Sequence, residues 1–227
     1  MSYNAVLEAD RAVTQKTEIL ISDVEVFGML RHILSFRDNE IVRHTKRTKK
    51  YVKILVQKML NMEEYKAYLR HINYESIAEV MTIHDIGKIG ICDDILFKPG
   101  RLTRTEFDEV KKHVMVGLSI LDSILAGRIN NSAVIQNCYD IIGCHHEWWD
   151  GTGYPNGLKG TEIPLSARIA AIADVYDALI SERSYKEACS HEEAVQIIRY
   201  GSGSHFDPDI INCFLDIEHH FRLISNN

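Results

Sequence analysis

Hydrophobic side chains recur every three or four positions in the early part of the chain. The positions that carry this pattern are Ile19, Val24, Phe27, Leu30, Ile33 and Leu34. Apolar residues at this spacing line one face of an amphipathic helix. No proline occurs before Pro99, so nothing in this region interrupts a helix as proline does. The pattern therefore predicts long helices.

Short polar motifs mark the expected starts of further helices. Three hydroxyl residues are each followed three positions later by a glutamate, in the pairs Ser76/Glu79, Thr103/Glu106 and Ser190/Glu193. In such a capping box the hydroxyl and the glutamate each satisfy a backbone N–H of the first helical turn. Asp207 followed by Pro208 fits an N-cap with proline at the first helical position. These motifs predict four helix starts.

One later segment is apolar on almost every side. Residues 165–181 read LSARIAAIADVYDALIS and predict a helix at the centre of the fold. The preceding stretch, Trp148 to Pro164, holds four glycines and two prolines and predicts a structured loop. We find no convincing run of alternating strand residues. The expected fold is therefore all-α, a helical bundle with a glycine-rich loop.

The first 35 residues differ in role from the rest. We expect residues 1–35 to form a lead-in helix or linker and residues 36–227 to form the main domain, with the polar step Arg37-Asp38-Asn39-Glu40 close to the division. The lead-in either joins a missing regulatory domain, and then offers a route to a homodimer, or packs on the main domain as ordinary core. Too few heptads are present to choose.

Composition excludes several classes of protein. The 227 residues carry a formal net charge of −6, which argues against sequence-independent binding of long nucleic acid. No apolar stretch approaches the ~20 residues that cross a bilayer. The five cysteines are an odd number without CxxC spacing, which favours reduced thiols in a cytoplasm over a disulfide framework.

Histidines and carboxylates form the most informative pattern. Taken singly, each has an ordinary explanation: an HD pair is often a cap, a Glu and a His four apart are often an ion pair, and a lone buried histidine is usually a hydrogen-bonded core residue. An adjacent histidine pair and an aspartate inside an apolar helix are harder to bury without a cation. The candidate metal ligands are Glu40, His44, His84, Asp85, His113, His145, His146 and Asp174.

The chemistry of this set predicts the metals. Imidazoles and carboxylates without thiolates suit Fe, Mn, Co, Ni or Zn better than Mg or Ca alone. Eight ligands are too many for one ion, so two or three are expected. The other histidines have no comparable partners and are expected on surfaces or in helix caps: His32, His71, His191, His205, His219 and His220.

Basic and aromatic residues beside these ligands predict a phosphate site. Lys88 follows Asp85 by three residues and could contact a phosphate oxygen or the leaving oxygen, although alone it would be read as a surface lysine. Arg183 and Lys186 follow the apolar helix and could clamp a second phosphate. In the loop, Tyr154 could stack on a base or bind a phosphate, and Pro155 fixes the turn.

Three long strings resemble the HD-GYP family of bacterial cyclic dinucleotide phosphodiesterases over roughly residues 36–215. They are HDIGKIGICDDILFKPGRLT, HHEWWDGTGYPNGLKGTEIPLSARIAAIADVYDALISERSYK and GSGSHFDPDII. The resemblance implies an HD-domain helical bundle that hydrolyses cyclic di-GMP to pGpG and, in many members, to GMP. All eight candidate ligands match family metal positions, with Glu40 at the glutamate of members thought to hold three metals, often iron; manganese is the second expectation.

The same resemblance implies roles outside the metals. Asp85 and Lys88 are the expected catalytic residues, and the expected substrate contacts are Lys88, Tyr154, Pro155, Arg183 and Lys186. An upstream receiver or sensor domain and diguanylate cyclases are expected partners. Two departures stand out: extra helical sequence around Glu64 to Glu75, and Cys92 where many members have proline. The alternatives are an HD-type hydrolase of another dinucleotide, such as cyclic GMP-AMP, a stress-nucleotide or deoxynucleotide hydrolase, and a non-catalytic sensor or docking module.

Overall fold

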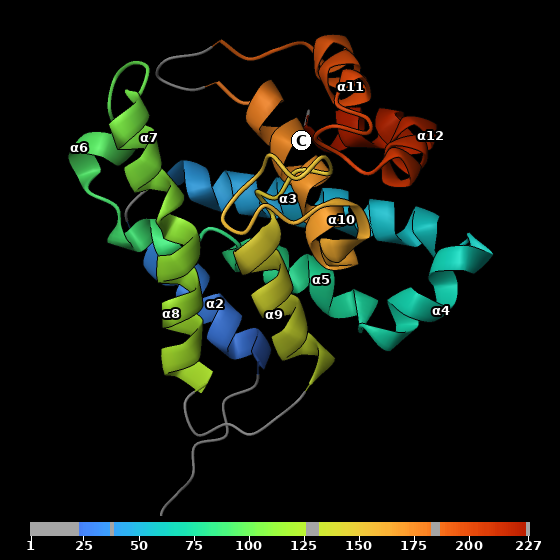
Figure 1. Cartoon of the computed structure of the whole chain (residues 1–227), viewed down its shortest axis with the longest axis horizontal. Helices are drawn as coiled ribbons and strands as arrows, with labels where there is room; N and C mark the ends of the chain where they lie inside the picture. Colours follow the sequence, from blue (N-terminus) through green and yellow to red (C-terminus); the bar gives the residue numbers. More distant parts are fainter. Residues whose placement is uncertain (1–22, 37–38, 126–131, 183–186, 226–227) are drawn as a thin grey trace, which may run out of the picture.

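The computed structural model describes residues 23–36, 39–125, 132–182 and 187–225, and helices dominate these ranges (Figure 1). The elements are α2 (Asp23–Ser35), α3 (Asn39–Met59), α4 (Glu63–His71), α5 (Tyr74–Val80), the 3-10 turns η1 (Met81–Ile83) and η2 (Ile86–Gly90), α6 (Asp93–Leu96), α7 (Arg104–Lys111), α8 (His113–Leu125), α9 (Ala133–Cys144), the 3-10 turn η3 (Gly160–Glu162), α10 (Leu165–Ile180), α11 (His191–Tyr200) and α12 (Pro208–Ser225). Within the described ranges no β-strand forms, which confirms the all-α expectation.

The core is built around α3 and α10. Helix α3 packs against α5, α10 and α12, and most residues of α10 are buried, as its apolar sequence predicts. Aromatic rings join these helices: Tyr51 of α3 stacks on Phe221 of α12 with centroids 4.6 Å apart, and it meets Tyr176 of α10 edge-on at 5.2 Å. This packing holds α3 and α10, which both carry candidate ligands, in a fixed relation.

Helix α2 covers part of this core. Phe27 and Leu34 are buried, and the helix packs against α3 and the turns η1 and η2. Residues 1–22 lie outside the described ranges, so the lead-in role and the division at residue 35 stay predictions. Among the described residues, no helix has both the length and the apolar character needed to cross a membrane.

Most of the predicted caps are present. Thr103 and Ser190 accept the N–H groups of Glu106 and Glu193 as capping boxes require. Asp207 accepts the N–H of Asp209 over 2.9 Å at the start of α12. These contacts confirm three of the four predicted helix starts.

The cap predicted at Ser76 is wrong. Helix α5 begins earlier, at Tyr74, directly after Asn73 in a left-handed conformation. The Ser76 hydroxyl donates to the Asn73 carbonyl over 2.8 Å and accepts from the buried Asn137 amide over 2.7 Å. Glu79 instead pairs with Lys49. The Ser76 hydroxyl, which the sequence predicts as a local helix cap, therefore makes a tertiary contact with α9 instead.

The sequence predicts the HD pair near the end of the helix that begins at Ser76, but in the structure the pair lies between two 3-10 turns. His84 follows η1 and Asp85 precedes η2. A glycine makes this turn fit: a Cβ on Gly87 would lie 1.8 Å from the carbonyl oxygen of His113. The sequence also predicts His113 inside the helix that follows Thr103, but that helix ends at Lys111 and His113 begins α8. The close approach at Gly87 brings Asp85 and His113 together.

The two departures from the family pattern lie apart from this turn. The extra sequence forms α4, at the edge of the molecule in Figure 1, and it is anchored by the buried Leu69. Cys92 is exposed and precedes α6 with φ −61°, an angle that proline also adopts. Neither change alters a candidate ligand.

Candidate metal centre

Two groups of histidine and aspartate side chains form between the helices. One contains Asp85, His113, His145 and His146, the other His44, His84 and Asp174, and within each group the ligand atoms lie within 4.8 Å of one another. The donors come from α3, the HD turn, α8, the end of α9 and α10. Seven of the eight candidate ligands are thus brought together, and their role as metal ligands stays a prediction.

Asp85 lies where the two groups meet. Its Oδ2 is 3.2 Å from Nε2 of His84 in one group. Its Oδ1 is 3.4 Å from Nε2 of His113 and 3.9 Å from Nε2 of His145 in the other. Each carboxylate oxygen therefore faces a different group. This is the arrangement that a carboxylate needs to bridge two neighbouring cations.

Backbone carbonyls set the orientation of three imidazoles. The Nδ1 atoms of His84, His113 and His145 lie 2.7–2.8 Å from carbonyl oxygens of Met81, Val110 and Ile141. A carbonyl only accepts, so each Nδ1 carries the hydrogen and, in a neutral ring, Nε2 keeps its lone pair. Every one of these Nε2 atoms points into the centre. This fixed tautomer is typical of metal-binding histidines.

His44 is oriented by a carboxylate instead. Its Nδ1 lies 2.9 Å from Oδ2 of Asp177, while its Nε2 lies 3.5 Å from Nε2 of His84 and 3.4 Å from Oδ1 of Asp174. With both Nδ1 atoms protonated, two neutral rings would turn lone pairs toward each other. A cation between them removes this repulsion.

Three buried atoms of the centre have no hydrogen-bond partner. They are Oδ1 of Asp85, Nε2 of His113 and Nε2 of His145. A buried acceptor without a partner costs about 1–3 kcal/mol, and such atoms are few in native proteins. All three belong to one group, whose ligand atoms lie within 4.8 Å of one another. The residues present therefore fit a metal ion.

The charge states agree with this conclusion. Burial lowers the pKa of His113, and it lowers that of His146 to about 3 and that of His145 well below its usual value. These rings are neutral at physiological pH, as metal ligands must be. Burial opposes ionisation of Asp174, but its contact with His84 outweighs burial and holds the Asp174 pKa well below its usual range.

The charge on His84 depends on the two carboxylates beside it. Burial opposes a charge on its ring, yet the neighbouring carboxylates of Asp85 and Asp174 outweigh burial and raise the His84 pKa to about 10. Asp85 stays ionised against burial because Lys88 and His84 lower its pKa. Two buried carboxylates thus attract a proton onto His84. A metal ion supplies the same positive charge and releases the His84 lone pair.

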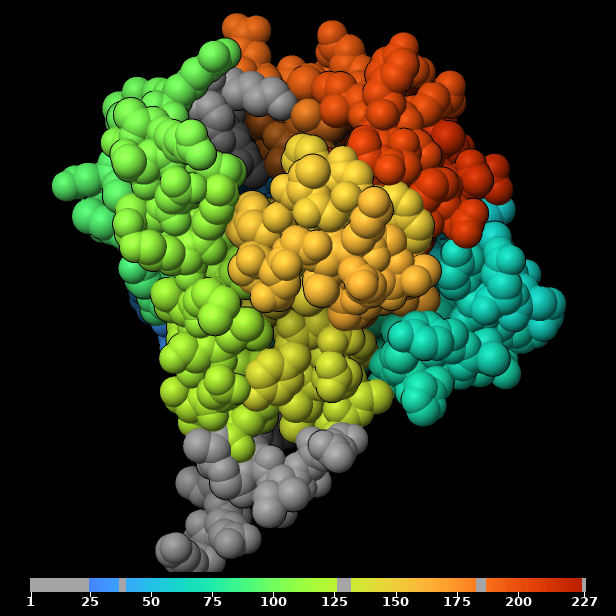
Figure 2. All heavy atoms as spheres, viewed as in Figure 1, coloured from blue at the N-terminus to red at the C-terminus, as the bar shows by residue number. Residues whose placement is uncertain are grey.

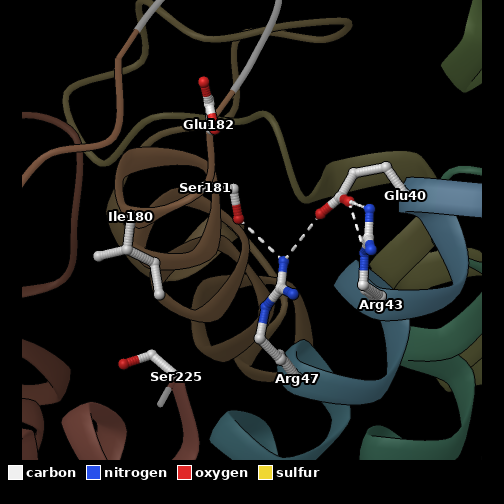
Figure 3. Close-up of a pocket in the computed structure, with 7 residues that line it drawn as sticks. All are labelled: Glu40, Arg43, Arg47, Ile180, Ser181, Glu182 and Ser225. Carbon is white, nitrogen blue, oxygen red and sulfur yellow. Dashed lines mark hydrogen bonds and ion pairs between the residues drawn. The ribbon is translucent and has the colours of Figure 1, made fainter. Parts of the chain in front are cut away.

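Glu40 is not in either group among the described residues. Its carboxylate pairs with Arg43 over 2.6 Å and with Arg47 over 3.2 Å. These residues line a pocket of about 470 Å³ with Ser181 (Figure 3). The arginine side chains already neutralise this carboxylate. Its role as a ligand of a third metal stays a prediction.

Sequence reasoning missed Asp177 and Arg47. Arg47 donates to both oxygens of the buried Asp177 over 2.6 and 2.8 Å, and to Ser181 over 2.9 Å (Figure 3 shows the arginine between Glu40 and Ser181). Burial opposes the charge on Asp177, but the bonds from His44 and Arg47 lower its pKa. One sequence feature could have identified Asp177: it follows the candidate ligand Asp174 by three residues and so lies on the same face of the helix.

Glu147 was also missed, although it follows the histidine pair. It is buried, and its two oxygens accept the backbone N–H groups of Asn156 and Leu158 over 2.7 and 3.0 Å. Gly153 lets the loop return this closely, since a Cβ there would lie 2.2 Å from the backbone nitrogen of Trp148. The carboxylate therefore ties the glycine-rich loop to the end of α9.

The predicted substrate residues lie beside the centre where the structure describes them. The Lys88 ammonium is 2.5 Å from Oδ2 of Asp85. The Tyr154 ring stacks on His146 with centroids 4.8 Å apart, and the exposed Pro155 follows it in the loop. Arg183 and Lys186 lie outside the described residues. The roles of all five stay predictions.

Two of the six remaining histidines, which we expect on surfaces or in helix caps, are only partly exposed. His191 is nearly buried and contacts the Tyr176 hydroxyl and Glu218. His205 is stacked between Trp148 and Phe206, with centroids 4.2 and 4.0 Å away. Both sit where helices or loops close over the core, which local sequence does not reveal. The exposed ones are His32, His71, His219 and His220.

Comparison with known proteins agrees with this picture. A family model described as "HD domain" matches residues 28–210. A "Probable cyclic di-GMP phosphodiesterase" of Vibrio cholerae is 46% identical over 88% of this chain and 45% of its own length. A "Cyclic di-GMP phosphodiesterase" of Thermotoga maritima is 38% identical over 92% of this chain and 52% of its own length.

Further relatives have other names. A "3'3'-cGAMP-specific phosphodiesterase 2" of Vibrio cholerae is 35% identical over 85% of this chain and 34% of its own length. The solved structure of an HDG"Y"P protein from Bdellovibrio bacteriovorus has the same fold, with a TM-score of 0.54 at 20% identity over 77% of this chain and 51% of that one. The chain spans about half the length of the first two relatives. The HD-domain resemblance and fold class are confirmed.

Proposed function

We propose that this chain, which belongs to the HD domain family, is the catalytic part of a metal-dependent phosphodiesterase that opens cyclic di-GMP to the linear dinucleotide pGpG. The observation that carries the proposal is the position of Asp85 between two groups of ligand atoms, with one oxygen facing each group. A bridged pair of cations is the usual apparatus for hydrolysing a phosphodiester.

The metals would be held by the two groups already described. His44, His84 and Asp174 would bind one ion, His113, His145 and His146 the other, and Asp85 would bridge them. Bound ions would supply an activated water and would stabilise charge on the phosphoryl oxygens. Nitrogen and oxygen donors without a thiolate suit iron, manganese, cobalt, nickel or zinc. We propose iron first and manganese second, as the HD-GYP resemblance implies.

Lys88 would act on the substrate rather than on the metals. Its ammonium contacts Asp85 but keeps 26% of the side chain exposed, so it can also reach a bound phosphodiester. An ammonium at this point would donate to a phosphate oxygen or to the departing 3′ oxygen. The carboxylate of Asp174, 16% exposed, marks a side on which the centre is open. Tyr154 and Pro155 would form one wall, and Arg183 and Lys186 would bind the second phosphate.

The test is hydrolysis of cyclic di-GMP by protein purified without oxygen, with metal content measured on the same sample. We expect pGpG as product, and product identification also shows whether GMP follows. Asp85→Ala should remove turnover and lower bound metal, because it deletes the bridge. The matched control is Asp94→Ala, at an exposed aspartate of α6. Full activity in Asp85→Ala would sink the proposal.

A mixed cyclic GMP-AMP is the second candidate substrate. A relative named as specific for 3'3'-cGAMP is 35% identical over 85% of this chain, which supports that substrate as the alternative. Competition between the two cyclic dinucleotides in one reaction decides the preference. Tight binding of either without turnover by metal-loaded protein would instead identify a sensor.

A further inference from the structure

Phe107 is an aromatic residue that lies outside the hydrophobic core. It lies in α7, a helix with no buried residue, and 45% of it is exposed. Its ring meets that of Tyr154 edge-on, with centroids 6.4 Å apart and an angle of 83°. Aromatic side chains contribute most to stability or binding when the faces of their rings are buried. Phe107 instead stands half open beside the glycine-rich loop.

The contact with Tyr154 connects Phe107 to the metal centre. Tyr154 stacks on His146 at 26° with centroids 4.8 Å apart, and its N–H donates to the His146 carbonyl over 3.1 Å. We name Phe107 and Tyr154 the aromatic shelf. The molecular surface is hollowed between α7 and the glycine-rich loop (Figure 2). The shelf thus leads outward from one of the candidate ligands.

A cation lies over the shelf. Nζ of Lys111 is 4.8 Å from the centroid of Phe107 and 5.6 Å from that of Tyr154, within the range of a cation–π contact. The same ammonium is 2.9 Å from Oδ1 of Asp108 on the surface. A lysine on an exposed helix can swing aside, so a flat ligand can take its place on the rings while the ammonium stays at the ligand's edge.

We propose that the aromatic shelf binds a purine base of the substrate, with Lys111 donating to acceptor atoms on that base. The inference rests on the proposed function, since it supplies the base-binding part of the same site. Bases stack on aromatic rings whatever their identity. Guanine also presents O6 and N7 as paired acceptors, whereas adenine presents N7 beside an amino donor. The shelf therefore provides affinity, and Lys111 provides a preference for guanine.

The first experiment removes the aromatic face. Phe107→Leu should raise KM for cyclic di-GMP about tenfold, the scale of one lost stacking contact, and leave kcat and metal content little changed. Phe107→Tyr should retain the low KM. The matched control is Phe97→Leu, at a phenylalanine that is 43% exposed next to α6. A cyclic dinucleotide carrying 2-aminopurine should lose its fluorescence quenching only with Phe107→Leu.

The second experiment tests the lysine. Lys111→Gln should weaken binding of cyclic di-GMP more than binding of cyclic di-AMP, each measured as a dissociation constant, while Phe107→Leu should weaken both alike. The control is Lys112→Gln, since Lys112 pairs with Glu109 on the exposed side of the same segment. Equal effects of Lys111→Gln on the two dissociation constants would refute the proposed guanine preference.

Outcomes for the shelf and for the proposed function are separable. If the unsubstituted protein neither binds nor hydrolyses any cyclic dinucleotide, the proposed function fails. If it hydrolyses cyclic di-GMP and Phe107→Leu leaves KM and 2-aminopurine quenching unchanged, the shelf alone is overturned. If Phe107→Leu does not fold, an unchanged affinity of Lys111→Gln for cyclic di-GMP overturns the proposal, and a loss of affinity that is larger for cyclic di-GMP than for cyclic di-AMP supports it.

Discussion

His44 directs Nδ1 at Oδ2 of Asp177 over 2.9 Å, and Arg47 donates two N–H groups to the same buried carboxylate. The bond fixes which nitrogen of His44 carries the hydrogen. It thereby turns the Nε2 lone pair toward Asp174 and His84. The Asp177 carboxylate acts on the candidate metal centre through His44.

We expect Asp177→Asn to weaken metal binding by about 10–100-fold, the usual loss when the partner of a ligating histidine changes. The amide is uncharged and can turn its NH₂ toward His44, which favours the wrong tautomer. Titration against a chelator measures the affinity. The control is Asp216→Asn, at an exposed aspartate paired with Lys58. Unchanged affinity in Asp177→Asn would rule out the positioning role.

Two glycines should respond oppositely to alanine. In Gly87→Ala the new Cβ would overlap the His113 carbonyl, so η2 and α8 must separate. We expect a loss of about 1–3 kcal/mol in the free energy of unfolding, together with reduced metal content, because Asp85 and His113 move apart. Denaturant titration and elemental analysis measure the two effects.

Gly28→Ala is the matched substitution. Nothing lies within 4 Å of a Cβ at Gly28, which is inside α2. Alanine is favoured over glycine in a helix by about 1 kcal/mol, so this variant should be more stable. Equal destabilisation of both variants would contradict the close approach of η2 to α8.

Glu147→Gln should loosen the glycine-rich loop. One acceptor oxygen becomes an NH₂ group that faces a backbone N–H, at a cost of about 1–3 kcal/mol for a buried donor left without its partner. Tyr154 would lose its fixed position over His146, so KM should rise while metal content is retained. Glu162→Gln, in the exposed turn η3 of the same loop, is the control. Identical kinetics in both variants would argue against the anchoring role.

His205 predicts a pH dependence of stability. Burial between aromatic rings lowers its pKa to about 4 in the folded protein, against about 6.5 in the unfolded chain. Between these values the unfolded state binds the proton and the folded state does not. The contribution of His205 to stability is therefore fully present above pH 6.5 and falls as the pH drops toward 4.

The comparison of unfolding free energies at pH 7 and pH 5 tests this. Relative to His205→Gln, the unsubstituted protein should lose about 1–2 kcal/mol over that interval, at about 1.4 kcal/mol per pKa unit and allowing for partial exposure. His219→Gln, at an exposed position, controls for the substitution itself. A constant difference between the unsubstituted protein and His205→Gln would contradict the lowered pKa.

Sequence periodicity and composition were sufficient for the helical class. The apolar run that became α10 is buried because apolar residues surround it on nearly all sides, a property of the residues themselves. The same holds for the capping boxes at Thr103 and Ser190, where both partners lie within one turn. Ser76 is different, because Asn137 of α9 reaches its hydroxyl from another part of the chain.

The ligand types were also readable in the sequence, since an imidazole pair and an aspartate in an apolar helix are costly to bury without a cation. The division of these ligands into two groups could be seen only in the folded chain, because contacts of 3–4 Å depend on how helices distant in sequence pack together. In the folded chain Asp85 lies between the two groups of ligand atoms, the Glu40 carboxylate pairs with arginine side chains, and Nδ1 of His44 contacts Asp177. The residue types determine that nitrogen and oxygen ligands are present, and the tertiary structure determines which of these atoms lie close enough to bind the same ion.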